Sequence, residues 1–279
     1  MHQEMHGITI SQSVPWTRED IRASIPEFLG LYAMRPISNN QGGMQIPHLF
    51  ATWFMLQQLQ PAYVIESGIW KGQGTWFFEK TLPDATIFSI DIDLNKREYI
   101  SPKAHYFHLD FSKIDWSIIP DKENALLFFD DHQNALERLK QGINLGFRKF
   151  IFEDNYPKGE GDCYSLKKAF QHAGHQIPLL NKGWRAVLAQ IWSPQQKDQA
   201  IAPNRQDADF LHSVLDLYYE FPPAFKSQKT RWGEIWADDL YPTPAPLFTT
   251  LEHDFLKPFE TQAMQYTWIC YCVVKETTL

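Results

Sequence analysis

Three glycines within seven positions, directly after an apolar run, constrain the fold of this chain more than any other feature. The stretch YVIESGIWKGQGTWFFEK spans residues 63–80, and its glycines are Gly68, Gly72 and Gly74. A missing Cβ permits a positive φ and lets a ligand approach the backbone closely. One glycine is enough for a tight strand-to-helix turn, so three favour a turn that binds a ligand. The alternative is a turn that binds nothing.

Short apolar runs alternate with helical patterns on both sides of this turn. Strands are expected at Ala62–Ile65 and then at 87–91, 105–110, 125–130 and 149–154. Helices are expected at Pro47–Pro61, at Thr75–Thr81 and at Asn134–Leu145, the last closed by Gly146. Apolar runs of this length, separated by helices, are typical of a parallel sheet covered on both faces. The expected fold class is therefore α/β, with a doubly wound, mainly parallel sheet.

The pattern becomes less regular beyond Gly183. Asp207–Tyr219 is interpreted as an amphipathic helix, and Tyr266–Lys275 as a strand that closes the sheet. We divide the chain into four parts: an N-terminal helical cap segment (1–60), a cofactor-binding α/β core (61–193), an elaboration or lid (194–260) and the closing strand of the core sheet (261–279).

Composition excludes several classes of function. The net charge is −7 and the Lys and Arg residues are scattered, so no nucleic-acid-binding surface is indicated. The longest apolar stretch, 49–56, is too short to cross a membrane. The first residues lack the pattern of a signal peptide. Cys270 and Cys272 alternate in an apolar strand and are expected to be reduced core residues, which favours a cytoplasmic protein.

Two nucleotide-binding families have this glycine spacing, the short-chain dehydrogenases and the class I S-adenosylmethionine-dependent methyltransferases. Glu66 lies two residues before Gly68, where a carboxylate suits a cofactor with an ammonium group and would repel a pyrophosphate. Asp91 ends the next strand, where an acid can accept both ribose hydroxyls of either cofactor. Tyr164 and Lys168 form a Tyr-x-x-x-Lys, but dehydrogenases carry theirs much further downstream, and one face of a helix explains the pair more simply. The methyltransferase interpretation is favoured.

The stretch VIESGIWKGQGT resembles the first motif of the catechol-type and caffeoyl-coenzyme-A-type O-methyltransferases. It is still more similar to the bacterial family named after cephalosporin hydroxylase and rhamnosyl O-methyltransferase. The resemblance covers roughly residues 40–170, and NQGGMQ (40–45) stands where that group folds an N-terminal segment over the cofactor. It implies that S-adenosylmethionine contacts the first motif and the acid that follows, with Asp110 or Ser112 near the adenine. The implied residues are Glu66, Gly68, Trp70, Gly72, Gly74 and Asp91. Gly74 departs from the Ser of many relatives, which puts one cofactor hydrogen bond in doubt.

Two acid pairs end neighbouring strands on the cofactor side, in FFDDH and IFEDN. Burying carboxylates together costs several kcal/mol unless a cation or donor compensates them. Oxygen ligands favour a hard ion such as Mg²⁺. The resemblance implies Asp130, Asp154 and Asn155 as ligands, while nearer relatives use an acid pair, so Glu153 competes with Asn155. The alternative is that these acids cap helices, as Asp131 could do.

The mechanism that follows places the acceptor hydroxyl on the ion held by Asp130 and attacks the methyl group in line. Catechol-type relatives have a lysine as base three residues after the first metal acid, but this chain has Gln133 there, so the base is open. His132 is the nearest candidate, because an ordinary histidine pKa of about 6.5 lets it accept a proton near neutrality. A polar group that satisfies the strand end is an equal alternative for His132.

The expected function is methyl transfer from S-adenosylmethionine, assisted by Mg²⁺, to a hydroxyl of a small molecule or saccharide. Three alternatives stay open: a metal-independent methyltransferase with His132 as base, a non-catalytic cofactor-binding protein and, least favoured, a short-chain dehydrogenase. Rings of the C-terminal half could stack on a sugar face or pack their own core, namely Trp184, Trp232, Trp236 and Tyr241. The oligomeric state is left open, a homo-oligomer included.

Overall fold

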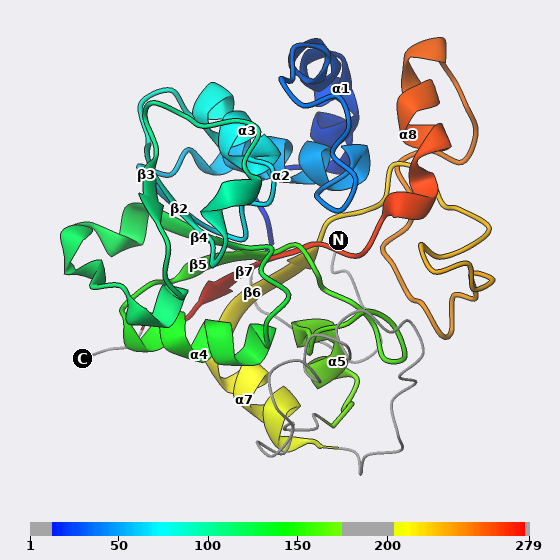
Figure 1. Ribbon diagram of the computed structural model, residues 1–279. Helices are drawn as coiled ribbons and strands as arrows, with labels where there is room; N and C mark the ends of the chain where they lie inside the picture. Colours follow the sequence, from blue (N-terminus) through cyan, green and yellow to red (C-terminus); the bar gives the residue numbers. More distant parts are fainter. Residues whose placement is uncertain (1–12, 175–203, 277–279) are drawn as a thin grey trace.

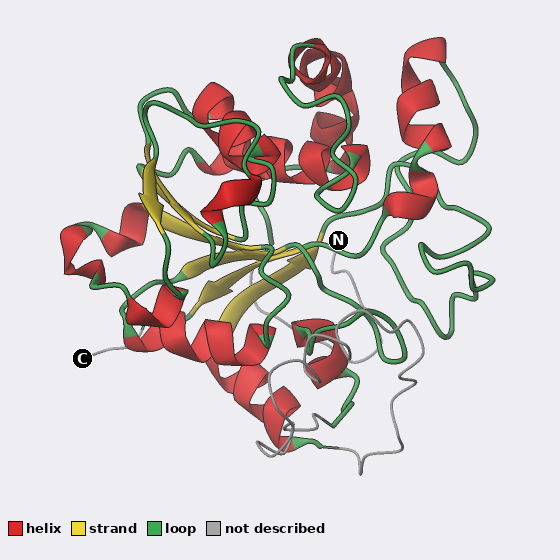
Figure 2. Cartoon of the chain, viewed as in Figure 1, coloured by secondary structure: helices red, strands yellow, loops and turns green. Residues whose placement is uncertain are grey.

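The computed structural model describes residues 13–174 and 204–276 of the chain (Figures 1 and 2). Its centre is a seven-stranded sheet with the strand order β3-β2-β1-β4-β5-β7-β6. Strands β1 to β5 pair in parallel, and β7 runs antiparallel to both β5 and β6. The strands are β1 (Tyr63–Ser67), β2 (Thr86–Ile90), β3 (His105–Phe107), β4 (Ala125–Phe129), β5 (Lys149–Phe152), β6 (Leu215–Glu220) and β7 (Cys270–Val274).

Helices cover both faces of this sheet, which confirms the predicted fold class. Figure 1 shows α1, α2 and α3 above the sheet and α4, α5 and α7 below it. The helices are α1 (Arg18–Ala33), α2 (Ile46–Leu59), α3 (Gln73–Thr81), α4 (Ala135–Asn144), α5 (Leu166–Phe170), α7 (Gln206–Val214) and α8 (Lys257–Thr261). None of the helices in the described ranges is long and apolar enough to cross a membrane.

Each face of the sheet has its own hydrophobic core, because successive side chains of a strand point to opposite faces. In β1, Val64 packs with the α1–α3 core and Ile65 packs with the α4–α7 core. Phe128 of β4 and Ile151 of β5 also belong to the first core. Glu66, Asp130 and Glu153 each lie two residues after one of these three side chains, within or just beyond the same strands. The same alternation therefore directs these acids to the face covered by α2 and α3.

The expected helix over Asp207–Tyr219 is only half correct. Helix α7 ends at Val214, and Leu215–Glu220 forms the edge strand β6. The residues of β6 are mainly leucine and tyrosine, and pairing with β7 buries Leu215, Leu217 and Tyr218, which outweighs the helical pattern. The sheet therefore takes a strand from the stretch that we interpreted as an elaboration. Strand β7 forms within the predicted stretch 266–275 and lies inside the sheet between β5 and β6.

The turn after β1 depends on Gly68 for a steric reason within the protein. Gly68 has a φ of +96°, and a Cβ at this position would lie 2.0 Å from the main-chain oxygen of Asp130. The chain leaving β4 thus lies directly against the chain leaving β1. This close approach brings the end of β4 against the glycine turn, at the point where the strand order reverses.

We predict that Gly68→Ala lowers the free energy of unfolding by roughly 2–6 kcal/mol, since it adds both backbone strain and an overlap with the main chain of Asp130. Gly30→Ala is the matched control, because Gly30 lies in α1 and a Cβ there would meet nothing outside the backbone of its own helix within 4 Å. Alanine there should be neutral or stabilising by up to about 1 kcal/mol. Urea unfolding of both variants checks the prediction, and equal stabilities would contradict it.

Candidate active site

The carboxylate of Glu66 lies buried at the carboxyl end of β1, against the glycine turn. It is 1% exposed, and its Oε2 accepts hydrogen bonds from Thr75 Oγ1 at 2.5 Å and Ser89 Oγ at 2.7 Å. A Cβ on Gly74 would lie 2.5 Å from Glu66 Oε1, so this glycine makes room for the carboxylate. No Lys or Arg side chain among the described residues forms an ion pair with Glu66. Burial raises the pKa of Glu66 to about 7, although the two hydroxyl donors oppose this shift.

Asp91 holds the glycine turn from the end of β2. Its Oδ2 accepts hydrogen bonds from the backbone N–H groups of Ile69 at 2.9 Å and Trp70 at 3.2 Å, and its Oδ1 accepts one from Asp93 N at 2.8 Å. The carboxylate thus orients the turn, and its Oδ1, which accepts one hydrogen bond, keeps lone-pair capacity for a further donor. Contact of Asp91 with a ribose stays a prediction.

The segment before α2 lies on the glycine turn, and its position over a cofactor, which the resemblance implied, stays a prediction. Trp70 has a φ of +50° and donates from Nε1 to the backbone oxygen of Gln41 at 3.0 Å. Its ring lies so close to Gly42 and Gly43 that a Cβ on either would be 3.3 Å or less from it. Trp70 therefore packs on residues 41–43, which is a different role from the cofactor contact that we predicted and that stays untested.

Two amides beside the turn have buried atoms without hydrogen-bond partners within the described part of the chain. They are Nε2 and Oε1 of Gln73, between Gly72 and Gly74, and Oδ1 of Asn40, whose Nδ2 donates to Met44 O at 2.9 Å. Buried polar groups without a partner cost about 1–3 kcal/mol each, so a polar ligand at this turn would relieve a real penalty. Sequence reasoning had no signal for either amide.

Asp110, which we expected near an adenine, is engaged by Arg138. The guanidinium of Arg138 donates to Asp110 from Nη1 at 3.1 Å and from Nη2 at 2.6 Å, and from Nε to Asp131 Oδ2 at 2.9 Å. Asp110 Oδ1 also accepts from Ser112 N and Oγ. The Arg138 interaction holds the pKa of Asp110 well below its usual range. These contacts tie the ends of β3 and β4 to α4, and a role of Asp110 or Ser112 toward adenine remains a prediction.

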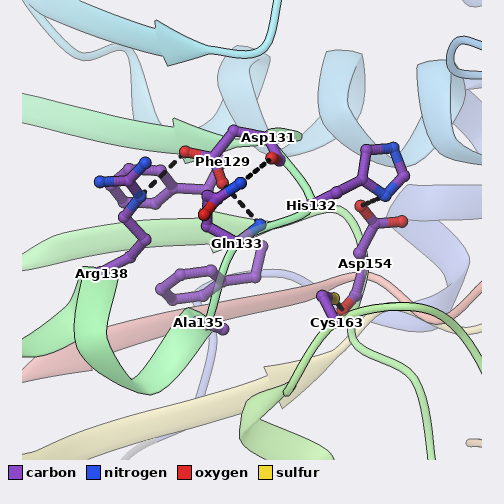
Figure 3. Close-up of a pocket in the computed structure, with 9 residues that line it drawn as sticks. Phe129, Asp131, His132, Gln133, Ala135, Arg138, Asp154 and Cys163 are labelled. Carbon is purple, nitrogen blue, oxygen red and sulfur yellow. Dashed lines mark hydrogen bonds and ion pairs between the residues drawn. The ribbon is translucent and has the colours of Figure 1, made fainter. Parts of the chain in front are cut away.

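Three potential ligand groups for a metal meet where β4 and β5 end. Asp130, His132 and Asp154 each contribute an atom, and these atoms lie within 4.8 Å of one another. His132 Nδ1 lies 3.1 Å from Asp154 Oδ2 and 3.1 Å from Asp162 Oδ1. Figure 3 shows the His132 ring turned toward the Asp154 carboxylate, with Cys163 below Asp154 in this view. His132 reaches this position with a φ of +52°, which is uncommon for a residue with a side chain.

Negative charge dominates this cluster. Burial and the neighbouring Glu153 carboxylate raise the pKa of Asp130 and that of Asp154 well above their ordinary value. Asp154 is 6% exposed, and while its Oδ1 accepts from Tyr156 OH at 2.5 Å, its Oδ2 accepts no hydrogen bond. The Asp154 carboxylate in turn raises the pKa of His132 well above 6.5, despite the opposing effect of burial. The neighbouring carboxylates therefore favour the protonated, cationic form of His132, whereas the sequence analysis started from an ordinary pKa for it.

Sequence reasoning missed His48, which belongs to the same region. His48 lies in the first turn of α2, 1% exposed, with Nδ1 2.5 Å from Glu153 Oε1. Its Nε2 accepts a hydrogen bond from Thr267 N at 2.9 Å. Burial lowers the pKa of His48 to about 3, so the ring is neutral. A histidine inside an otherwise apolar helix carries no motif, and Glu153 is 105 residues away, so sequence alone could not pair them.

Asn155, one of the predicted metal ligands, has a different role. Its Oδ1 accepts from Lys167 N at 3.0 Å, and its Nδ2 donates to Tyr218 OH at 2.7 Å. The amide is fully buried and both of its ends are engaged by α5 and β6, so it is not free to face the cluster. Of the two candidates that the sequence leaves open, Glu153 is the one whose charge acts on both Asp130 and Asp154, and a role of either as a metal ligand stays a prediction.

The aromatic residues near the cluster are mostly buried against one another. Trp236 stacks on Trp268 with ring centroids 5.0 Å apart, and Tyr241 packs beside them. Trp232 differs, because it is 39% exposed and its ring meets that of Tyr156 at 5.2 Å. Trp184 lies outside the described residues. Of the rings considered, Trp232 is therefore the accessible one close to Asp154.

The Tyr-x-x-x-Lys pair is not arranged as a catalytic pair. Tyr164 precedes α5, and its hydroxyl lies 2.8 Å from Ala173 O and 2.8 Å from Asp207 Oδ2, with one proton to donate between these two acceptors. Lys168 lies within α5 and donates from Nζ to Cys163 O at 3.0 Å. Both side chains tie the segment after β5 to its surroundings, so a dehydrogenase gains no support from them.

Comparisons with known proteins add likenesses of fold. No protein-family model and no curated protein matches the sequence. One similar solved structure is CmcI with SAH, 18% identical over 53% of this chain and 82% of that chain, with a TM-score of 0.35. Another is the SAH-bound methyltransferase PaMTH1 of Podospora anserina, 9% identical over 95% and 91%, with a TM-score of 0.44. The plantazolicin methyltransferase BpumL in complex with a monoazolic desmethylPZN analog and SAH is 15% identical over 93% of this chain and 96% of that chain, with a TM-score of 0.42. These identities are too low to carry site residues over to this chain.

The buried Glu66 gives a prediction about stability and pH. Its pKa is about 7 in the folded protein against an ordinary 4.5, so the folded state holds a proton that the unfolded chain releases between these values. Glu66 therefore destabilises the fold increasingly as the pH rises from about 4.5 to 7, by about 3 kcal/mol at pH 8. Glu66→Gln should remove this cost and be more stable than the wild type at pH 8, with little difference at pH 4.5. Thermal unfolding across this range checks it, and a pH-independent difference would contradict it.

Proposed function

We propose that this protein is an S-adenosylmethionine-dependent methyltransferase that acts on a hydroxyl group. The observation that carries the proposal is the buried Glu66 carboxylate beside the glycine turn, without a cation from the described part of the protein. A buried carboxylate is favourable only when a positive charge or several donors compensate it. The ammonium of an amino acid attached to a nucleoside would supply that charge, and a diphosphate would add to the repulsion.

We further infer that Asp130 and Asp154 of the cluster, together with the neighbouring Glu153, bind a hard divalent cation such as Mg²⁺. The residues fit such an ion because they offer carboxylate oxygens, and Asp154 Oδ2 is buried without a hydrogen bond. His132 is the cation that now balances these acids in part. An ion here would replace that positive charge and relieve the repulsion between the carboxylates.

The residues divide the reaction between them. The cofactor would supply the electrophilic methyl group, and the ion would supply positive charge for a deprotonated acceptor oxygen. Glu66 and the 68–74 turn bind the amino-acid end of the cofactor, and Asp91 orients the turn. Asp130 and Asp154, at the ends of β4 and β5, fix the acceptor side, so that catalysis rests largely on alignment across the switch point of the sheet.

A metal-independent enzyme with His132 as base is the second candidate, and the charges oppose it. Asp154, Asp162 and Asp130 all raise the pKa of His132, which favours the protonated ring and opposes its use as a base. Such an enzyme would be active mainly at high pH and would survive chelation of divalent ions. A non-catalytic protein would bind the cofactor without turnover on any acceptor.

The acceptor that we propose is a small molecule or saccharide that presents a hydroxyl group and a flat face. Trp232 lies in a tight turn in which Gly233 N donates to Thr230 O at 2.9 Å, and Thr230 N donates to Glu234 O at 2.8 Å. The exposed ring is linked to the cluster through Tyr156, whose hydroxyl bonds Asp154. A sugar or aromatic ring stacked on Trp232 would thus lie beside the carboxylates. The acids around it favour an uncharged acceptor over an anionic one.

Cofactor binding tests the proposal directly. We expect S-adenosylmethionine to bind the wild type and Glu66→Gln to weaken binding roughly 10- to 100-fold, because a charged hydrogen bond is lost. Wild-type affinity should fall as the pH drops below about 7, where Glu66 takes up a proton, and the variant should lack this dependence. Calorimetric titrations at pH 6 and pH 8, with and without Mg²⁺, measure both effects, with Glu137→Gln on the exposed side of α4 as control. Wild-type affinity in the Glu66 variant would rule the proposal out.

The acceptor assignment has its own test. Trp232→Ala should raise the KM for the acceptor roughly tenfold while leaving cofactor affinity and the melting temperature within error, since the ring is exposed and lies away from the glycine turn. Trp236→Ala serves as the comparison, because that ring is packed on Trp268 and its loss should lower stability. An unchanged acceptor KM in the Trp232 variant would remove this residue from the acceptor site.

A further inference from the structure

We propose that His48 is a positioning residue that holds the Glu153 carboxylate in place for a divalent cation. The inference rests on the proposed metal site and adds a residue from α2 that the ligand set alone does not include. It is drawn from hydrogen-bond geometry, from burial and from the position of α2 in the fold.

The hydrogen bonds of His48 determine where its proton lies. The backbone N–H of Thr267 donates to Nε2 at 2.9 Å, so Nε2 must be the unprotonated nitrogen. The single proton of the neutral ring is therefore on Nδ1, 2.5 Å from Glu153 Oε1. His48 thus donates one directed hydrogen bond to this carboxylate. Glu153 Oε2 takes no part in this hydrogen bond.

The surroundings of His48 leave the ring little freedom to move. It is 1% exposed, and its ring meets Tyr266 edge-on at 5.5 Å. The helix that carries it is buried along most of its length, from Ile46 to Leu56. A donor fixed in this way restricts the orientation of the carboxylate that it bonds, and a carboxylate fixed before an ion arrives binds it with less loss of entropy.

Position in the fold gives His48 a second consequence. The residues just before α2, 41–43, lie on Trp70 of the glycine turn, and His48 is in the first turn of the same helix. Glu153 follows β5, and Thr267 precedes β7. His48 therefore joins the segment over the proposed cofactor turn to the carboxylates of the proposed metal site. Because its hydrogen bond goes to Glu153, a change at His48 should affect binding of the ion more than binding of the cofactor.

The test uses Mn²⁺ as the probe, with free Mn²⁺ measured by electron paramagnetic resonance. His48→Phe keeps the ring volume but removes the donor, and we expect Mn²⁺ affinity to fall roughly 10- to 100-fold. His48→Asn places an amide N–H near the position of Nδ1 and should restore part of the affinity. His212→Phe, at an exposed histidine of α7 on the other side of the sheet, should bind as the wild type does. Melting temperatures without metal separate loss of binding from loss of fold.

The outcomes separate this inference from the metal site itself. A wild type that binds no Mn²⁺ would reject the proposed site and this inference with it. A wild type that binds, together with a His48→Phe variant that binds equally well, would reject only the role of His48. A readout that needs no metal is the ¹⁵N spectrum of labelled histidines, in which His48 should be protonated on Nδ1 alone. A ring protonated on Nε2 would overturn the inference even if the Phe variant failed to fold.

Discussion

Carboxylates buried with too little positive charge at one edge of a sheet are the constraint on which this site depends. Strands β1, β4 and β5 each place an acid on the face covered by α2 and α3, two residues beyond an apolar side chain of that core. Desolvation of several acids together costs free energy that local hydroxyl donors offset only in part. The pKa values of Glu66, Asp130 and Asp154 are all raised, which is the signature of groups that lack a counter-charge. A cationic ligand at Glu66 and another at Asp130 and Asp154 would supply the missing positive charge most simply.

The glycine turn has a second explanation that the sequence does not reveal. A Cβ would meet Asp130 O at 2.0 Å from Gly68, and Glu66 Oε1 at 2.5 Å from Gly74. Gly68 is thus required by the close approach of the chain after β4, and Gly74 by the buried carboxylate of Glu66. Three glycines in seven positions are therefore weaker evidence for a ligand than the sequence alone suggests. Glu66 is the stronger evidence, because its carboxylate is buried without an ion pair to a Lys or Arg of the described residues.

The parts of the molecule with local signals could be predicted, and the parts set by distant contacts could not. Apolar runs of four or five residues bounded by turns located β1, β2, β4 and β5, because strands buried on both faces must be apolar throughout. The sequence pattern predicts a helix where β6 forms. Nothing in that pattern indicates the partner strand β7, whose paired residues lie 50 or more positions further along the chain. The engagement of Asn155 by Lys167 and Tyr218 likewise needs three elements at once. His48 has no neighbouring signal at all, and only the packing of α2 against the end of β5 brings it to Glu153.

The central claim is that Glu66 selects a nucleoside ligand by its ammonium group. The most direct measurement compares the affinity of the wild type for SAH with that for the analogue of SAH that lacks the α-amino group, with NAD as a third ligand. If Glu66 selects the ammonium group, the deaminated analogue binds at least tenfold more weakly than SAH and NAD does not bind. Equal affinity for the two adenosine ligands, or tight binding of NAD, would contradict it.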